Sequence, residues 1–140
     1  MSEVLKFQFD VDGQNFTSAG QASVQVKKNL RQLGIPSETI RRVSIAMYEG
    51  EINMVIHAGG GKATVVVHED MIEIILADNG PGIANVELAM QEGFSTAPDN
   101  IRSLGFGAGM GLPNMKRYTD DMKIETQLGK GTCITMCVKL

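Results

Sequence analysis

The sequence YEGEIN places a carboxylate and a carboxamide four residues apart, at Glu49 and Asn53. In a helix this spacing turns the two side chains only about 40° apart around the axis, so they emerge on one face, one turn apart. Such a pair could polarise a hydroxyl group or a water molecule and could offer an oxygen to a metal ion. The alternative is an ordinary solvated helix face. Glu51 points to a different face and is interpreted as structural or surface.

A second candidate is the segment ILADNGPGI, residues 75–83, in which an apolar run ends at Asp78 and a glycine-rich turn follows. A carboxylate at the end of a buried strand can anchor a ligand group that donates a hydrogen bond. The amino group of adenine is such a donor, whereas guanine carries an oxygen at the corresponding position. The alternative is an ordinary Asn-Gly or Pro-Gly turn.

The third candidate is SLGFGAGMGLPNMKR, residues 103–117, which has glycine at every second position from Gly105 to Gly111. It lacks the Gly-Lys-Ser/Thr ending of a P-loop, and it follows an irregular segment rather than the strand that a dinucleotide fingerprint requires. It leads into a helix, whose free N–H groups attract anions, and glycine lets a backbone approach phosphate closely. On composition alone, a flexible linker is an equal alternative.

The elements that must position these residues follow from periodicity and from turn residues. The pattern predicts strands over residues 5–11, 63–68, 71–77, 122–127 and 132–139, a helix capped by Ser18 that runs to about Leu33, and helices over residues 37–58, 86–92 and 110–118. Residues 93–109 show little periodicity and are interpreted as a functional lid. We expect an α/β two-layer sandwich with helices on one face of a mixed, largely antiparallel sheet. A doubly wound Rossmann domain is disfavoured, because βαβ units do not recur.

Length and charge restrict the function further. A chain of 140 residues predicts a single domain, residues 1–140, and a net charge of −3 without a basic stripe disfavours nucleic acid as a partner. The sequence shows neither a signal-like apolar region nor a membrane span, so we expect a soluble cytoplasmic protein. Cys133 and Cys137 lie too far apart on one strand for a disulfide, and we expect two small core residues on the same face rather than a metal or redox pair.

The order of the three candidates resembles the nucleotide-binding signature of the GHKL ATPases, the superfamily of gyrase, Hsp90, sensor histidine kinases and MutL. The N box corresponds to residues 49–53, the G1 box to residues 78–82 and the G2 box to residues 107–112. The resemblance extends from about Ser37 to the last residue and implies the Bergerat ATP-binding fold, with ATP and Mg²⁺ as cofactors.

Within that superfamily, the segments EGFST, GAGMGLPNMKR and LGKGT are similar to the small stand-alone serine/threonine kinases that regulate sigma factors, including anti-sigma kinases and switch kinases. The resemblance implies transfer of phosphate from Mg-ATP to a small partner of the anti-sigma-factor antagonist type, and it allows a sigma factor as a further partner and a homodimer. The alternative is an ATP-binding regulatory module with little or no kinase activity.

The resemblance also implies a role for each site residue. Glu49 would be the general base, and Asn53 would be a ligand of Mg²⁺. The residues implied in cofactor binding are Asn53, Asp78, Gly80, Gly82, Gly107, Gly109, Met110, Gly111, Leu112 and Thr132. Asp78 would accept a hydrogen bond from the adenine amino group, with Thr132 assisting through water. The glycines of the G2 box would present N–H groups to phosphate, with Lys116 or Arg117 as helpers. Met110 stands where the family more often has leucine, and His57 is interpreted as a structural residue at a helix end.

Overall fold

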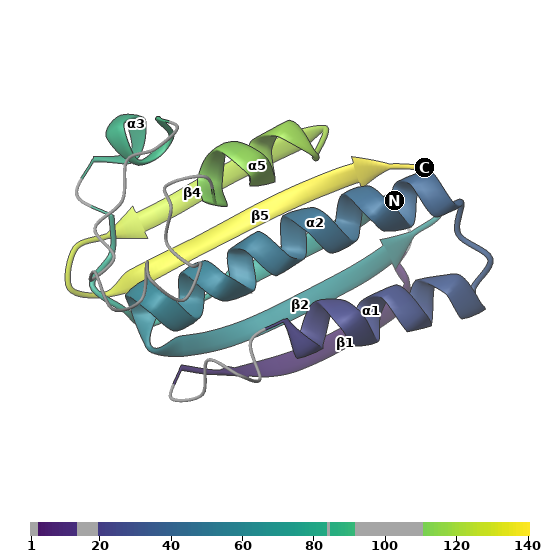
Figure 1. Ribbon diagram of the computed structural model, residues 1–140, viewed down its shortest axis with the longest axis horizontal. Helices are drawn as coiled ribbons and strands as arrows, with labels where there is room; N and C mark the ends of the chain where they lie inside the picture. Colours follow the sequence, from purple (N-terminus) through teal and green to yellow (C-terminus); the bar gives the residue numbers. More distant parts are fainter. Residues whose placement is uncertain (1–2, 14–19, 84, 92–110) are drawn as a thin grey trace.

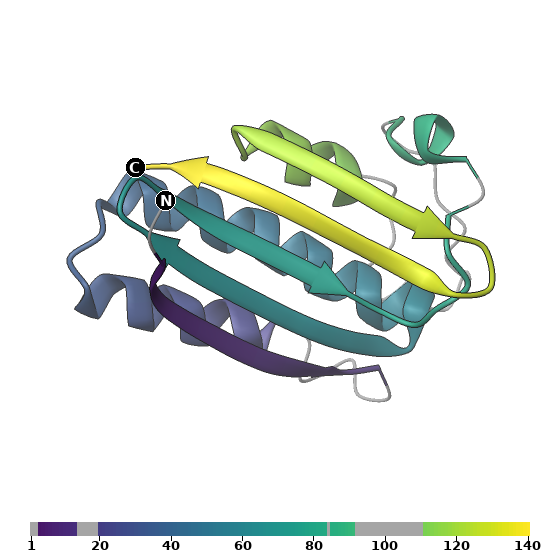
Figure 2. The ribbon, with the colours of Figure 1, turned by 180° about the vertical axis from the view of Figure 1, so that it is seen from behind.

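The computed structural model describes residues 3–13, 20–83, 85–91 and 111–140 (Figure 1). In chain order the elements are β1 (Glu3–Asp12), α1 (Gln21–Gln32), α2 (Ser37–Asn53), η2 (Met54–Ala58), β2 (Gly60–His68), β3 (Met71–Ala77), α3 (Val86–Ala89), α5 (Gly111–Arg117), β4 (Asp121–Gln127) and β5 (Gly131–Lys139). The strands form one sheet in the order β1-β2-β3-β5-β4, and every neighbouring pair is antiparallel. Figure 2 shows this sheet from behind. The expected fold class is confirmed.

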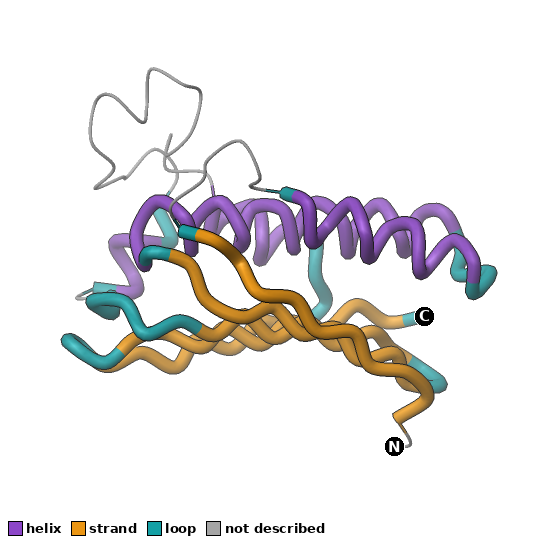
Figure 3. The backbone as a smooth tube through the Cα atoms, turned by 90° about the horizontal axis from the view of Figure 1, so that it is seen from below, coloured by secondary structure: helices purple, strands orange, loops and turns teal. Residues whose placement is uncertain are grey.

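Helices α1, α2 and α5 cover one face of the sheet, as the edge-on view in Figure 3 shows. Strand alternation explains the core between the two layers, because every second residue of β3 is buried, namely Ile72, Ile74 and Leu76. The central helix α2 contributes Val43 and Met47, both fully buried. The sheet therefore carries α2 across its middle, with α1 on one side and α5 on the other (Figure 1).

Glu51 joins α2 to the beginning of α1. Its carboxylate accepts backbone N–H bonds from Gly20 at 2.9 Å, from Ala22 at 3.3 Å and from Ser23 at 2.7 Å. The first turn of a helix has N–H groups without partners inside the helix, and a carboxylate there also meets the positive end of the helix dipole. Glu51 is only 2% exposed, so the structural interpretation is correct and a surface position is wrong.

Arg42 anchors the far end of α5. Its side chain donates to the Tyr118 carbonyl at 3.1 Å and pairs with Asp120 at 3.2 Å, and Asp120 also accepts from the backbone N–H of Lys139 at 2.7 Å. These contacts tie α2, the end of α5 and strand β5 together. They hold α5 beside the face of α2 that carries Glu49.

The long helix expected over residues 37–58 changes character after Asn53. Residues Met54–Ala58 form a π-helical turn, which closes with an N–H bond from Gly59 to the Met54 carbonyl. Single π turns inside helices occur frequently at functional sites. Strand β2 then begins at Gly60, three residues before the predicted start, because the glycine run enters the sheet instead of forming a loop.

The expectation that Cys133 and Cys137 are core residues is wrong. They do share a face of β5, but Thr132, Ile134, Met136 and Val138 occupy the face that is buried beneath the helices, and the two free cysteines lie half-buried on the other face. Burial raises the pKa of the Cys137 thiol, and the negative charge of Glu73 adds to that rise. Among the described residues, no three or more His, Cys, Asp or Glu side chains are grouped so that they could hold a metal ion.

The remaining differences are small. The helix α3 (Val86–Ala89) is shorter than predicted, and α5 (Gly111–Arg117) ends one residue before the predicted end. Ser18, the predicted cap, and the predicted lid at residues 93–109 lie outside the described residues. None of the described helices is long and apolar enough to cross a membrane.

Candidate functional site

Asp78 follows the last residue of β3 and is bound to the neighbouring strand β5. Its backbone N–H donates to the Thr132 carbonyl at 2.9 Å, and its Oδ1 accepts from the backbone N–H groups of Gly80 at 2.9 Å and Thr132 at 3.1 Å. Within the described part of the chain, Oδ2 has no hydrogen-bond partner. The carboxylate is thus fixed through one oxygen, and the other can accept a hydrogen bond from a ligand.

The loop after Asp78 is packed too closely to be an independent turn. A Cβ on Gly80 would lie 2.7 Å from the Cα of Ala58, and a Cβ on Gly82, which has φ +81°, would lie 2.6 Å from the Gln127 carbonyl. The carbonyl of Pro81 accepts from the N–H of Gly129 at 2.9 Å. The loop therefore lies between the end of η2 and the β4–β5 turn, and both glycines are required there.

Thr132 belongs to a hydroxyl pair that the sequence analysis did not include. Its Oγ1 lies 2.9 Å from Oγ1 of Thr126, which also accepts from the backbone N–H of Ile83 at 2.8 Å. The signal was present in the sequence, because Thr126 and Thr132 stand directly opposite each other across the hairpin turn. Thr126 thus links β4, the loop after Asp78 and Thr132.

Glu49 lies on the side of α2 that faces α5. Its Oε1 is 3.5 Å from Nδ2 of Asn114, a residue of α5 that the sequence analysis also missed. Burial raises the pKa of the half-buried Glu49 carboxyl, and the hydrogen bond from Asn114 opposes that rise. Among the described residues this carboxylate has one weak partner, so it remains available to another group.

Asn53 lies one turn further along the same helix and meets the first residue of α5. A Cβ on Gly111 would lie 3.0 to 3.2 Å from the three terminal atoms of the Asn53 carboxamide. The predicted N box and the end of the predicted G2 box are therefore adjacent in space. Glycine at position 111 leaves room for the carboxamide beside the backbone.

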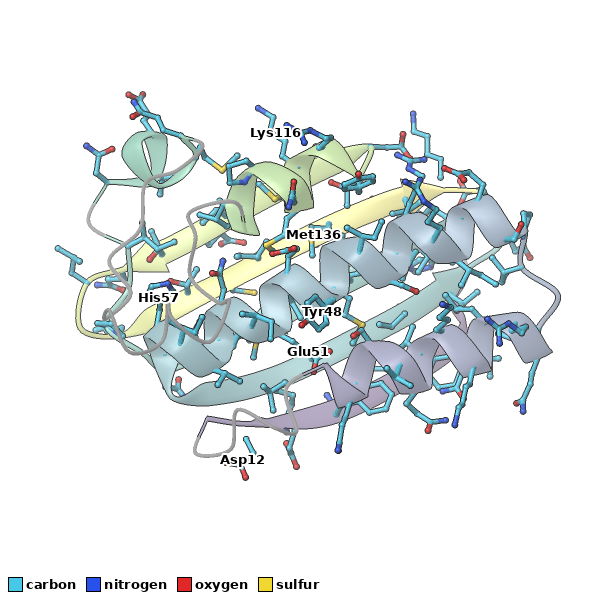
Figure 4. The ribbon with its side chains drawn as sticks, viewed as in Figure 1. Asp12, Tyr48, Glu51, His57, Lys116 and Met136 are labelled. Atoms are coloured by element: carbon cyan, nitrogen blue, oxygen red, sulfur yellow. The ribbon has the colours of Figure 1, made fainter. Side chains whose placement is uncertain are left out.

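The other predicted residues of the G2 box divide into two groups. Gly107, Gly109 and Met110 lie outside the described residues. Leu112 is buried and its side chain belongs to the hydrophobic core, so it fixes α5 on the sheet. Lys116 and Arg117 are exposed in the last turn of α5, and Figure 4 shows Lys116 on the outer side of that helix.

His57 lies in the π turn, and burial lowers the pKa of its ring. Figure 4 shows it at the same end of the molecule as the loop after Asp78. Its place at the end of the helix agrees with the structural interpretation.

Comparisons with known proteins support the fold and identify the family. The sequence profile of the family described as histidine kinase-, DNA gyrase B-, and HSP90-like ATPase matches residues 38–140. An anti-sigma F factor from Clostridium acetobutylicum is 34% identical over 137 residues, which cover 94% of this chain and 89% of that protein. The serine/threonine-protein kinase RsbT of Bacillus subtilis is 31% identical over 116 residues, which cover 79% of this chain and 81% of the kinase.

Two solved structures share the fold. The RsbU and RsbW domains of a Mycobacterium tuberculosis protein superpose with a TM-score of 0.68 at 15% identity, over 98% of this chain and 33% of that one. The mycobacterial sensor histidine kinase MprB superposes with a TM-score of 0.56 at 17% identity, over 96% of this chain and 97% of the other. The fold, the matched residues and the similarity to full-length relatives lead to one conclusion. The chain belongs to the family of histidine kinase-, DNA gyrase B-, and HSP90-like ATPases.

Proposed function

We propose that this protein is a Mg-ATP-dependent serine/threonine kinase that regulates a sigma-factor pathway by phosphorylating a small partner of the anti-sigma-factor antagonist type. The relatives named anti-sigma F factor and serine/threonine-protein kinase support the pathway and the reaction. The observation that carries the proposal is the half-buried carboxylate of Glu49, held on the α5 side of α2 with one weak partner among the residues that the structure describes. The proposed place of action is the cytoplasm.

The base of ATP would bind at the Asp78 end of the site. Oδ2 of Asp78 is the available acceptor for the 6-amino group, since Oδ1 already holds two backbone N–H groups. Gly80 and Gly82 would let the loop pass close beneath the base, and Thr132 would contribute its hydroxyl. The donor pattern fits adenine, because guanine has no amino group at that position.

The phosphates and Mg²⁺ would lie between α2 and the start of α5. The oxygen of the Asn53 carboxamide is a suitable ligand for Mg²⁺, which commonly takes its other ligands from phosphates and water. Gly107, Gly109 and Gly111 would present backbone N–H groups to the phosphates, with Met110 and Leu112 completing this segment. The contact between Gly111 and Asn53 supports this placement, because it brings the two boxes together. Bound Mg²⁺ would neutralise the charge that develops on the transferred phosphoryl group.

Glu49 would act as the general base for the attacking hydroxyl of the partner protein. Asn114 donates toward Oε1, and this contact restrains the carboxylate while its other oxygen can accept the hydroxyl proton. A raised pKa makes a carboxylate a stronger proton acceptor, provided that it remains ionised at the working pH. Catalysis would then consist of positioning the hydroxyl in line with the γ-phosphate and removing its proton.

The test is transfer of labelled γ-phosphate from ATP to a purified antagonist-type protein, the product of a neighbouring gene being the first choice of substrate. We expect Glu49→Gln to lower the transfer rate by about 100-fold or more, while ATP affinity is retained. Glu38→Gln is the matched control, because Glu38 is an exposed glutamate on the same helix and forms a surface pair with Arg41. Transfer at the parent rate by Glu49→Gln would exclude the proposed base. Tight ATP binding without transfer to any antagonist-type protein would favour the regulatory module instead.

A further inference from the structure

The hydroxyl pair formed by Thr126 and Thr132 lies beside the carboxylate of Asp78. Thr132 is 7% exposed, and its backbone N–H is bound to Oδ1 of Asp78 at 3.1 Å. The two hydroxyl oxygens are 2.9 Å apart, and Thr126 Oγ1 lies 3.3 Å from the Gly131 carbonyl. Thr126 therefore holds the position from which the orientation of the Thr132 hydroxyl can be controlled.

Either hydroxyl can donate in the contact between Thr126 and Thr132, and the recipient of the Thr126 proton decides which one does. A threonine hydroxyl has one proton to donate and two lone pairs. One lone pair of Thr126 Oγ1 is used by the N–H of Ile83, which can only donate. The single proton of Thr126 can go to Thr132 Oγ1 at 2.9 Å or to the Gly131 carbonyl at 3.3 Å. The shorter contact has the better distance for an O–H···O bond.

When Thr126 donates to Thr132, Thr132 accepts in that bond and keeps its own proton for another acceptor. The base site then presents two neighbouring groups of opposite character. Oδ2 of Asp78 can only accept, as an ionised carboxylate, and Oγ1 of Thr132 donates. Adenine carries the complementary pair, a donating 6-amino group next to the accepting N1. A 6-oxopurine carries the reverse pair, an accepting oxygen next to a donating N1–H.

We propose that Thr126 is a positioning residue that orients the proton of Thr132 toward N1 of the base and so helps the site to select a 6-aminopurine over a 6-oxopurine. The inference rests on the proposed binding of ATP at Asp78. With a water molecule between Thr132 and the base, that water accepts from Thr132 and can donate to N1 of adenine. Thr126 acts through Thr132 and need not touch the nucleotide.

The experiment compares the affinities for ATP and inosine triphosphate by titration calorimetry with Mg²⁺ present. Inosine triphosphate is the probe because it reverses the two groups at issue without adding the 2-amino group of guanine. We expect the parent to prefer ATP and Thr126→Val to lower the ratio of the two affinities about tenfold. Thr126→Ser, which restores a hydroxyl, should recover the parent ratio. A merely structural role would weaken binding of both nucleotides equally, so an unchanged ratio in Thr126→Val overturns the proposal.

Two further variants keep the test decisive if Thr126→Val does not fold. Thr126→Cys loses the γ-methyl group and keeps a weaker donor at the γ position, so its ratio should fall between those of the parent and Thr132→Val. Thr132→Val removes the donor itself and should lose the same selectivity as Thr126→Val. A parent-like ratio in both Thr126→Cys and Thr132→Val would contradict the inference. A parent that shows no preference for ATP, or binds neither nucleotide, would instead contradict the proposed base site at Asp78, and this distinguishes the failure of the two proposals.

Discussion

Glu49 and Glu51 lie two residues apart on α2 and face different neighbours. On the α1 side, the carboxylate of Glu51 is 2% exposed and accepts three backbone N–H bonds (Figure 4). On the α5 side, Glu49 is half-buried, and within the described part of the chain its carboxylate has a single contact, of 3.5 Å, with Asn114. The same side chain on the same helix is therefore saturated in one place and available in the other.

The difference shows how a carboxylate with a structural role can be distinguished from one that can bind a ligand or act in catalysis. A buried charge that already has all its hydrogen bonds cannot accept another without losing one, whereas a carboxylate with a spare oxygen can accept from a ligand or a substrate. Asp78 combines the two conditions, since one oxygen is bound by the protein and the other has no partner among the described residues. Substitutions at these three positions should therefore have different consequences.

The largest effect on stability is expected at Glu51. Glu51→Gln replaces one accepting oxygen by an NH₂ group that faces backbone donors, so we expect the free energy of unfolding to fall by about 3 kcal/mol. Urea denaturation measures this change. The exposed Glu38→Gln serves as control and should change the unfolding free energy by less than about 0.5 kcal/mol. A loss that small in Glu51→Gln would show that the two sides of α2 do not differ as the hydrogen bonds indicate.

A smaller effect, on binding, is expected at Asp78. Asp78→Asn can keep an oxygen toward Gly80 and Thr132, but it then turns an NH₂ group toward the adenine amino group. We expect the affinity for ATP to fall about 10- to 100-fold, the range for hydrogen bonds to charged groups. Calorimetric titration measures it, with Asp70→Asn, in the turn between β2 and β3, as control. Equal affinities for the parent and Asp78→Asn would mean that Oδ2 does not meet the base.

The pH dependence of phosphate transfer in an Asn114 variant tests the assignment of Glu49 as the base. Burial raises the pKa of its carboxyl and Asn114 lowers it, so Asn114→Leu should raise that pKa further. Because a general base must be ionised, the acid limb of the rate profile for phosphate transfer should move to higher pH in this variant. Transfer rates measured across the acidic range test this. An unchanged acid limb in Asn114→Leu would show that Asn114 does not influence the ionisation of the proposed base.

The smallest expected effect is on how the stability of the protein depends on pH, and it also concerns Glu49. The pKa of Glu49 is raised above its ordinary value of 4.5, so ionisation costs more in the folded than in the unfolded protein. Stability should therefore fall as pH rises from that value through the raised one. Glu49→Gln should lack this fall. The difference in unfolding free energy between Glu49→Gln and the parent should therefore shift slightly in favour of the variant between acidic and neutral pH. Parallel curves of unfolding free energy against pH for the two proteins would contradict the raised pKa.

Local patterns predicted most of the fold, because strands and helices here follow their periodicities closely. The alternating apolar residues Ile134, Met136 and Val138 show which face of β5 is buried. The same alternation puts Cys133 and Cys137 on the opposite face. The prediction instead followed the general tendency of cysteine to be buried. That error was avoidable from the sequence.

The contacts of the site were harder to predict. The helical spacing showed that Glu51 faces away from Glu49, but its partners at Gly20 to Ser23 are about thirty residues earlier in the chain, and no local pattern states which helix end will meet it. Asn114 is likewise separated from Glu49 by residues 50–113. Thr126 could have been found, since the register of a hairpin follows from its turn. The roles of Glu49, Asn53 and Asp78 in binding and catalysis remain predictions.

The π turn at Met54–Ala58 also has a consequence for how this chain can vary in length. Each residue advances an α-helix by about 100°, so one additional residue in a turn resets the phase of everything that follows it. Asn53, before the turn, is directed by α2, whereas Ala58, after it, seats the loop at Gly80. Removing one residue here would leave the proposed metal ligand in place and rotate the support of the base-binding loop. Deletion of a single residue in this π turn would therefore weaken binding of the base more than binding of the phosphates.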